Sequence, residues 1–102
     1  MAAKSKRDRP RIVGATVGRD RLVQLRLAGD RKLDVRPKVS DMLDIASRQQ
    51  LAAFEILGRG QWIHWPELQE AMSAEWLVQQ SKKTPDLVRL HGVVAEAGGS
   101  RS

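Results

Sequence analysis

The sequence contains no cysteine, which excludes disulfide bonds, thiolate nucleophiles and zinc–sulfur sites. No uninterrupted apolar run approaches the roughly 20 residues that a helix needs to span a bilayer. The first residues are charged and no apolar run follows them, so we expect no secretory signal. A reducing compartment suits a chain without disulfides. We therefore expect a cytoplasmic protein that makes no contact with membranes.

Motifs for catalysis and for nucleotide binding are missing from the sequence too. It has no Gly-x-Ser-x-Gly, no Walker loop and no Gly-x-Gly-x-x-Gly. His64 and His91 are the only histidines, and neither belongs to a His-x-His, His-x3-His or His-Glu-x2-His pattern. We predict no catalytic residue, no metal site and no cofactor, and we expect His64 to be structural. A small enzyme that uses His64 with Glu67 ranks last among the alternatives.

Charge is distributed unevenly along the chain, which has a net charge of +6. Residues 1–38 hold twelve Lys or Arg against four Asp or Glu, whereas residues 39–81 hold two basic residues against six acidic ones. This separation favours a polyanion or an electrostatically complementary protein as a partner. The alternative is that the charge serves solubility alone.

The 102 residues fit one small domain with tails. Residues 1–10 are basic and almost free of large apolar side chains, which predicts a disordered arm. The predicted α+β domain occupies residues 11–80. Residues 81–102 form a C-terminal extension that we expect to be partly loose, although residues 87–94 are apolar enough to dock as a strand or helix.

Alternation of apolar and polar residues predicts an antiparallel meander of three strands, over residues 12–17, 22–27 and 32–35. A helix is then expected from Ser40 or Asp41 to about Gln50 or Leu51, because either residue can cap it. Two further strands, over residues 52–57 and 61–65, would form a hairpin through Gly58-Arg59-Gly60. The predicted fold class is α+β: an antiparallel sheet in the order β-β-β-α-β-β, with one main helix packed on one face and a short C-terminal helix.

The second strand of that hairpin carries two of the three tryptophans. Alternation places Trp62 and His64 on one face and Ile63 and Trp65 on the other. Pro66 should end the strand and begin a helical turn. After it, Ser73 is suited to cap a helix over residues 74–78. We expect Trp76 and Leu77, within that helix, to fold back onto the core.

This region resembles a bacterial family catalogued as domain of unknown function 2442. The resemblance rests on Gly60, the run Ile63-His64-Trp65-Pro66-Glu67-Leu68, Ser73 and Trp76-Leu77, and it covers most of residues 11–80. In that family an acidic run usually follows the apolar-His-Trp-Pro core. The chain departs from the pattern there, because Gln69-Glu70-Ala71-Met72 keeps only one acid after Glu67.

The resemblance implies a small α+β domain with no established catalytic activity. It also implies a partnership with a small neighbouring protein, because such domains look like components of proposed toxin–antitoxin pairs. Our first hypothesis is therefore a non-enzymatic protein-interaction module, antitoxin-like or regulatory in role. We expect Trp62, His64, Glu67 and Glu70 to bind the partner. A strand edge that pairs between copies would make a homodimer.

The second hypothesis is nucleic-acid binding without sequence preference, through the basic arm and the arginines of the sheet. The sequence offers no aromatic side chains interleaved with these basic residues, so contact with phosphates is the expected mode. The candidate residues for this mode are Lys4, Lys6, Arg7, Arg9, Arg11, Arg26, Arg31 and Lys32.

Overall fold

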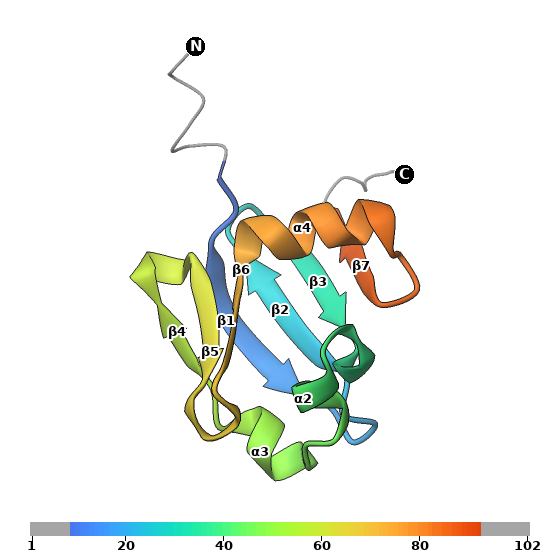
Figure 1. Cartoon of the computed structure of the whole chain (residues 1–102). Helices are drawn as coiled ribbons and strands as arrows, with labels where there is room; N and C mark the ends of the chain where they lie inside the picture. The colour runs from blue at the N-terminus through green and yellow to red at the C-terminus, as the bar shows by residue number, and fades with distance from the viewer. Residues whose placement is uncertain (1–8, 93–102) are drawn as a thin grey trace.

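Two antiparallel sheets organise the computed structural model, which describes residues 9–92 (Figure 1). The α+β class is therefore confirmed, with two sheets in place of the single sheet expected. Most of the predicted basic arm, residues 1–8, and the end of the predicted extension, residues 93–102, lie outside the described residues.

The larger sheet has four strands in the order β1-β2-β3-β7. The predicted meander forms its first three strands and is confirmed, with Leu25 of β2 paired to Ala15 and Leu33 on either side. The fourth strand lies within the predicted extension and pairs antiparallel with β3. The packed part of the chain thus continues past residue 80. The strands are β1 (Ile12–Val17), β2 (Val23–Leu27), β3 (Arg31–Val35) and β7 (Val88–His91).

The smaller sheet has three strands in the order β4-β5-β6. The expected hairpin joins its first two strands through a 3-10 turn at Gly58–Gly60, and its second strand ends at Trp65 as Pro66 requires. The third strand was not expected from the sequence. It follows the helical turn η3 (Pro66–Leu68) and Gln69, whose φ of 52° reverses the chain. The strands are β4 (Glu55–Leu57), β5 (Trp62–Trp65) and β6 (Glu70–Ser73).

The prediction of one main helix after β3 is wrong. The chain instead forms a 3-10 turn η1 (Pro37–Val39) and two short helices, α2 (Asp41–Asp44) and α3 (Arg48–Ala52). The break has a local cause at Ser47, which adopts an extended conformation. Its hydroxyl accepts from the backbone N–H of Gln50, and the Gln50 side chain accepts from the backbone N–H of Ser47. This capping box starts a new helix where the sequence had suggested a continuous one.

Arginines from the first half of the chain hold these short helices in place. Arg21 Nη1 donates to the carbonyls of Asp44 at 3.0 Å and Ala46 at 2.8 Å, which lie at the end of α2. Carbonyls at the end of a helix lack partners within the helix. A cation can donate hydrogen bonds to them and is attracted to the negative end of the helix dipole. From α3, Arg48 Nε donates to the carbonyl of Gly18 at 3.1 Å. Arg21 and Arg48 are therefore each bonded to backbone carbonyls of another segment of the fold.

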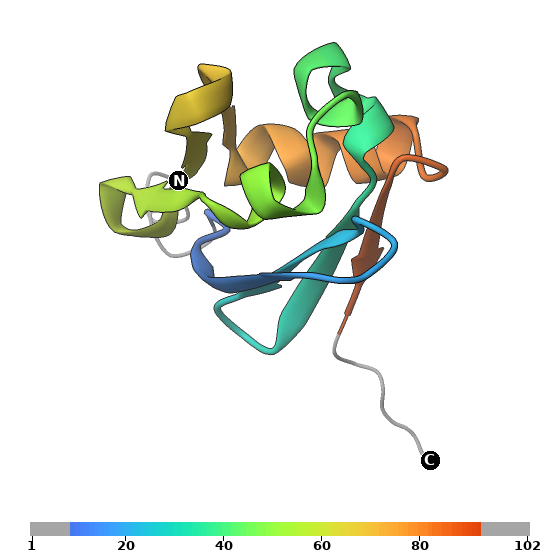
Figure 2. The ribbon, with the colours of Figure 1, turned by 90° about the horizontal axis from the view of Figure 1, so that it is seen from below.

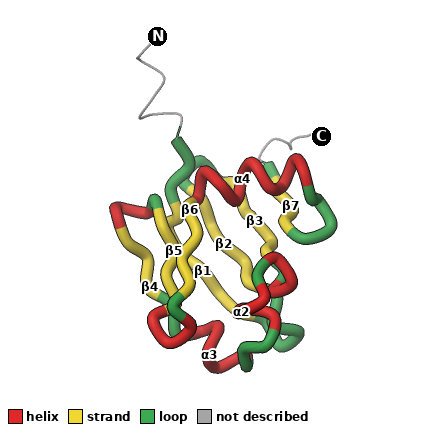
Figure 3. Tube along the Cα trace, in the orientation of Figure 1, coloured by secondary structure: helices red, strands yellow, loops and turns green. Residues whose placement is uncertain are grey.

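The longest helix of the described residues is α4 (Ala74–Lys83), which Ser73 caps as predicted and which runs beyond residue 78. It lies against β6 and β7 and so connects the two sheets (Figures 1 and 3). Figure 2 shows the helices and the smaller sheet on one side of the larger sheet. Across residues 9–92 we find no helix with the length and apolar character required to cross a membrane.

One hydrophobic core lies between the two sheets. The larger sheet contributes Leu25 and Leu33, the smaller sheet contributes Ile63 and Trp65, and α4 contributes Leu77; all five are at most 1% exposed. The inward residues of each strand alternate with exposed ones, which is the pattern of a sheet with one covered face. Burial of this shared core holds the sheets together.

The turn between β4 and β5 comes close to β1 at Gly60, which has a φ of +94°. A Cβ atom at this position would lie 2.6 Å from the carbonyl oxygen of Ile12 and 2.9 Å from its nitrogen. We predict that Gly60→Ala lowers the free energy of unfolding by about 3 kcal/mol, because backbone strain adds to the clash. Urea denaturation measures this change.

Gly29→Ala is the matched control. Gly29 has a similar φ of +89°, but nothing lies within 4 Å of its virtual Cβ. Only the conformational cost applies, about 1 kcal/mol. Equal losses for the two variants would show that the approach of Gly60 to β1 is not a stabilising feature of the fold.

Candidate functional site

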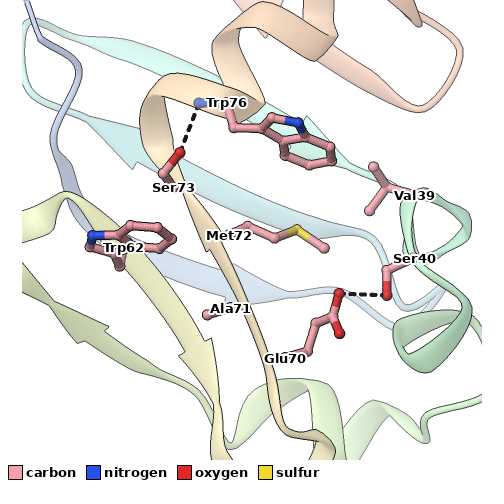
Figure 4. Close-up of a pocket in the computed structure, with 8 residues that line it drawn as sticks. All are labelled: Val39, Ser40, Trp62, Glu70, Ala71, Met72, Ser73 and Trp76. Atoms are coloured by element: carbon pink, nitrogen blue, oxygen red, sulfur yellow. Dashed lines mark hydrogen bonds between the residues drawn. The ribbon is translucent and has the colours of Figure 1, made fainter.

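A groove of about 500 Å³ with a mainly apolar lining lies beside β6. Figure 4 shows its lining: the indoles of Trp62 and Trp76 lie on either side of β6, and Val39 and Ser40 lie across from the strand. The groove therefore lies where the smaller sheet ends and the helical segments begin. Its lining residues are Val39, Ser40, Trp62, Glu70, Ala71, Met72, Ser73 and Trp76.

Trp62 owes its exposure to the phase of β5. Ile63 and Trp65 are 0% and 1% exposed, so the residues that alternate with them must face outward. Trp62 is 45% exposed, and its strand neighbour Leu57 on β4 is 44% exposed. A large apolar surface is thus left uncovered on the outer face of the smaller sheet.

Trp76 forms the second wall of the groove. The Ser73 hydroxyl accepts from its backbone N–H at 3.0 Å and fixes the first turn of α4. That turn buries Ala74 and Leu77 and leaves the indole of Trp76 39% exposed. Leu77 packs in the core as expected, whereas the prediction that Trp76 folds back onto the core is wrong. The helical phase that Ser73 sets could have revealed this, because Trp76 lies off the stripe of Ala74 and Leu77.

One end of the groove is polar. Ser40 Oγ donates to Glu70 Oε2 at 2.9 Å, which links η1 to β6 across the recess (Figure 4). Met72 is only 5% exposed and supplies an apolar floor. The groove therefore combines two aromatic walls, an apolar floor and one carboxylate.

The structure brings together two of the four residues expected to bind a partner. Trp62 and Glu70 both line the groove. His64 lies on the outer face of β5 opposite Ala71, and its Nδ1 is 3.3 Å from Glu55 Oε1. Glu67 is exposed in η3 and does not line the groove. His64 therefore lies beside Glu55, whereas the enzyme alternative pairs it with Glu67.

The sequence did not predict the wall of the groove that lies across from β6, which Val39 and Ser40 form. Val39 and Ser40 come from a turn more than thirty positions earlier in the chain than Ala71 and Met72. No local pattern connects these two segments. Among residues 9–92 there is also no group of three or more His, Cys, Asp or Glu side chains placed to hold a metal ion.

The candidate nucleic-acid residues are divided between several places. Lys4, Lys6 and Arg7 lie outside the described residues. Arg9 lies near Trp62 and Glu75, at a hollow next to the groove.

The other candidates lie in or beside the larger sheet. The Arg11 carbonyl accepts from Ala28 N–H at 2.9 Å. Arg26, Arg31 and Lys32 gather at a shallow hollow at the β2–β3 end of the larger sheet. The sheet therefore assembles a small basic cluster, separate from the groove.

Comparisons with known proteins identify a family and one similar solved structure. A family model described as "Protein of unknown function (DUF2442)" matches residues 12–83. A crystal structure of a protein of unknown function from Rhodospirillum rubrum ATCC 11170 is similar, with a TM-score of 0.63 and 32% sequence identity. The similarity covers 69% of this chain and 86% of that one. None of the curated proteins matches the sequence.

The two tryptophans of β5 should respond differently to substitution. Trp65 Nε1 donates to the carbonyl of Leu51 at 2.8 Å in the core. Trp65→Phe removes this donor and leaves a buried carbonyl unsatisfied, so we predict a loss of about 2–3 kcal/mol in the free energy of unfolding. Trp62→Phe should change it by less than about 0.5 kcal/mol, since the side chain is on the surface. Similar losses in chemical denaturation would contradict the assignment of Trp65 to the core and Trp62 to the surface.

Proposed function

The chain belongs to the DUF2442 family, and from that premise we propose that it is a non-enzymatic protein-interaction module. The proposed partner is a small neighbouring protein, toward which the chain acts as an antitoxin-like or regulatory component. The proposed place of this interaction is the cytoplasm, which suits a chain without cysteine. The proposed contact surface is the groove between Trp62 and Trp76, together with Glu70.

The observation that carries this proposal is the exposure of two indoles on the same groove. Trp62 is 45% exposed and Trp76 is 39% exposed, although tryptophan is usually highly buried. Exposed apolar patches of this kind mark interaction sites, and tryptophan is enriched among the residues that contribute most to binding. Glu70 at the edge of the groove adds a charged group that would fix the orientation of a partner.

The setting of His64 favours binding over catalysis. Its side chain is 32% exposed and its carboxylate neighbour Glu55 is 55% exposed. Electrostatic stabilisation by an enzyme is strongest in enclosed surroundings that exclude water. The pair of His64 and Glu55 lies instead on an open sheet surface, so the proposal assigns it no chemical step.

Co-purification tests the interaction proposal. The tagged full-length chain is expressed in its native host, and its stably associated protein is identified by mass spectrometry and then produced for binding measurements. We predict that Trp62→Ala and Trp76→Ala each weaken the complex at least tenfold, as expected for aromatic residues central to an interface.

Val13→Ala is the control, because Val13 is 55% exposed but lies on β1, away from the groove. It should bind like the wild type. Folded Trp62→Ala and Trp76→Ala variants that retain full affinity would contradict the proposed surface.

A second candidate function is contact with nucleic acid, and the basic cluster of the larger sheet favours it. Arg26 and Lys32 are directly paired across β2 and β3. Asp34 on the same face accepts from Gln24 Nε2 at 2.8 Å and lies 2.7 Å from His91 Nε2. Asp30 lines the same hollow, but no carboxylate of the described residues forms an ion pair with Arg26, Arg31 or Lys32. The positive charges are thus left to face solvent, where phosphates could approach them.

Salt dependence tests this second candidate. Binding of single-stranded DNA should weaken steeply as salt rises, and Arg26→Ala should reduce the slope of log K against log salt by about 0.7. Lys38→Ala removes the same charge from η1, so it should leave the slope unchanged. The absence of any gel shift at low salt would eliminate the candidate.

A further inference from the structure

We propose that the edge of β6 binds its partner as an added β-strand, which pairs with the backbone of Ala71 and Ser73. This inference rests on the proposed function, because it specifies how the groove would hold a protein. It concerns the backbone of β6, whereas the proposed function concerns the indoles. The two can therefore fail separately.

The hydrogen-bond register of the smaller sheet shows which groups are available. Ala74 N–H donates to the carbonyl of Gln61 at 2.8 Å, so this antiparallel pair is a hydrogen-bonded one. Such pairs alternate with pairs whose N–H and C=O groups point away from each other. The next hydrogen-bonded pair is Ile63 with Met72, which directs the backbone groups of Ala71 and the N–H of Ser73 away from β5.

These groups point to an edge that no strand covers within the described residues. The sheet order is β4-β5-β6, so β6 is terminal. In the described part of the chain, none of the hydrogen bonds outside the regular elements uses the N–H or C=O of Ala71 or the N–H of Ser73. Exposed strand edges of this kind are templates for pairing with another chain. In this protein the edge opens into the groove, where aromatic side chains can add contact area.

The groove limits the length of the added strand. At one end Ser40 Oγ bonds to Glu70 Oε2, and at the other end α4 begins directly after Ser73. The open edge therefore spans Ala71–Ser73. A segment of about three to five residues in extended conformation would cover it, at roughly 3.4 Å per residue.

The chemistry of the edge also specifies the side chains of the occupant. A residue opposite Met72 would point to the inner face of β6, toward the apolar floor, and favours an aliphatic side chain. A residue opposite Glu70 would lie beside a carboxylate whose second oxygen can accept from an incoming cation, and favours Lys or Arg. An antiparallel partner would therefore present the pattern aliphatic-x-basic.

Charge complementarity favours such a partner over a second copy of the chain. All eight lining residues belong to the segment 39–81, which carries six acidic and two basic residues, and Glu70 is the one charged residue among them. A second copy paired through β6 would bring another Glu70 to the interface. Like charges placed together weaken association. A basic extended segment of a different protein gains from attraction to the Glu70 carboxylate.

Amide NMR on the full-length, 15N-labelled chain tests the inference. The probe is the pentapeptide acetyl-Thr-Ile-Thr-Lys-Thr-amide, which carries the aliphatic-x-basic pattern. We expect the peptide to slow hydrogen exchange at the Ala71 and Ser73 amides at least fivefold, while the Met72 amide, already bonded to β5, stays the same.

Three matched controls isolate the strand pairing. N-methylation of the central Thr removes the donor to the Ala71 carbonyl and should weaken binding about five- to tenfold, consistent with the loss of one hydrogen bond. Replacing the Lys of the peptide by Glu should weaken it as well. Glu70→Gln should reduce the difference between the Lys and Glu peptides.

Each remaining outcome overturns the inference. Shifts of the Trp62 and Trp76 indole resonances without protection at Ala71 and Ser73 would mean that the groove binds without strand pairing. Hydrogen exchange at the Ala71 amide that slows as the protein concentration rises, without any peptide, would identify a second copy of the chain as the occupant. Unchanged hydrogen exchange at millimolar peptide would exclude the aliphatic-x-basic strand. The proposed function would then still be tested separately, by the effect of Trp62→Ala on the affinity of the co-purified complex.

Discussion

The burial of Trp65 between the two sheets is the constraint on which the rest of the structure depends. Its indole is 1% exposed and its Nε1 donates to the Leu51 carbonyl, so it connects β5 to the end of α3. Because side chains alternate along a strand, the burial of Trp65 and Ile63 requires Trp62 and His64 to face outward. An exposed indole is thus the direct consequence of a buried one three residues later.

The groove follows from how the two sheets meet. The smaller sheet ends at β6, and α4 begins immediately after it and crosses to β7 (Figure 1). This leaves the edge of β6 facing η1, where the Ser40–Glu70 hydrogen bond spans the gap. Glu70 is the charged residue that lines the groove, whereas the basic cluster lies on the larger sheet. The carboxylate of the groove and the basic cluster therefore lie at different places on the molecule.

Local patterns predicted the elements that local forces determine. The three-strand meander, the end of β5 before Pro66 and the cap at Ser73 each depend on a few adjacent residues, and all three are confirmed. The single long helix failed because the capping box at Ser47 outweighs the apolar spacing around it. The sequence could not reveal β6, because Glu70-Ala71-Met72-Ser73 lacks a strong strand pattern and becomes a strand by pairing with β5. The wall formed by Val39 and Ser40 depends on tertiary packing in the same way.

Fluorine NMR of the chain labelled with 5-fluorotryptophan tests the central claim most directly, since the protein has three tryptophans. The account predicts that the resonances of Trp62 and Trp76 shift between H2O and D2O and again when the co-purified partner is added. The resonance of Trp65 should stay unchanged in both experiments. A solvent-sensitive Trp65, or a Trp62 that responds to neither solvent nor partner, would contradict the division of β5 into a core face and a binding face.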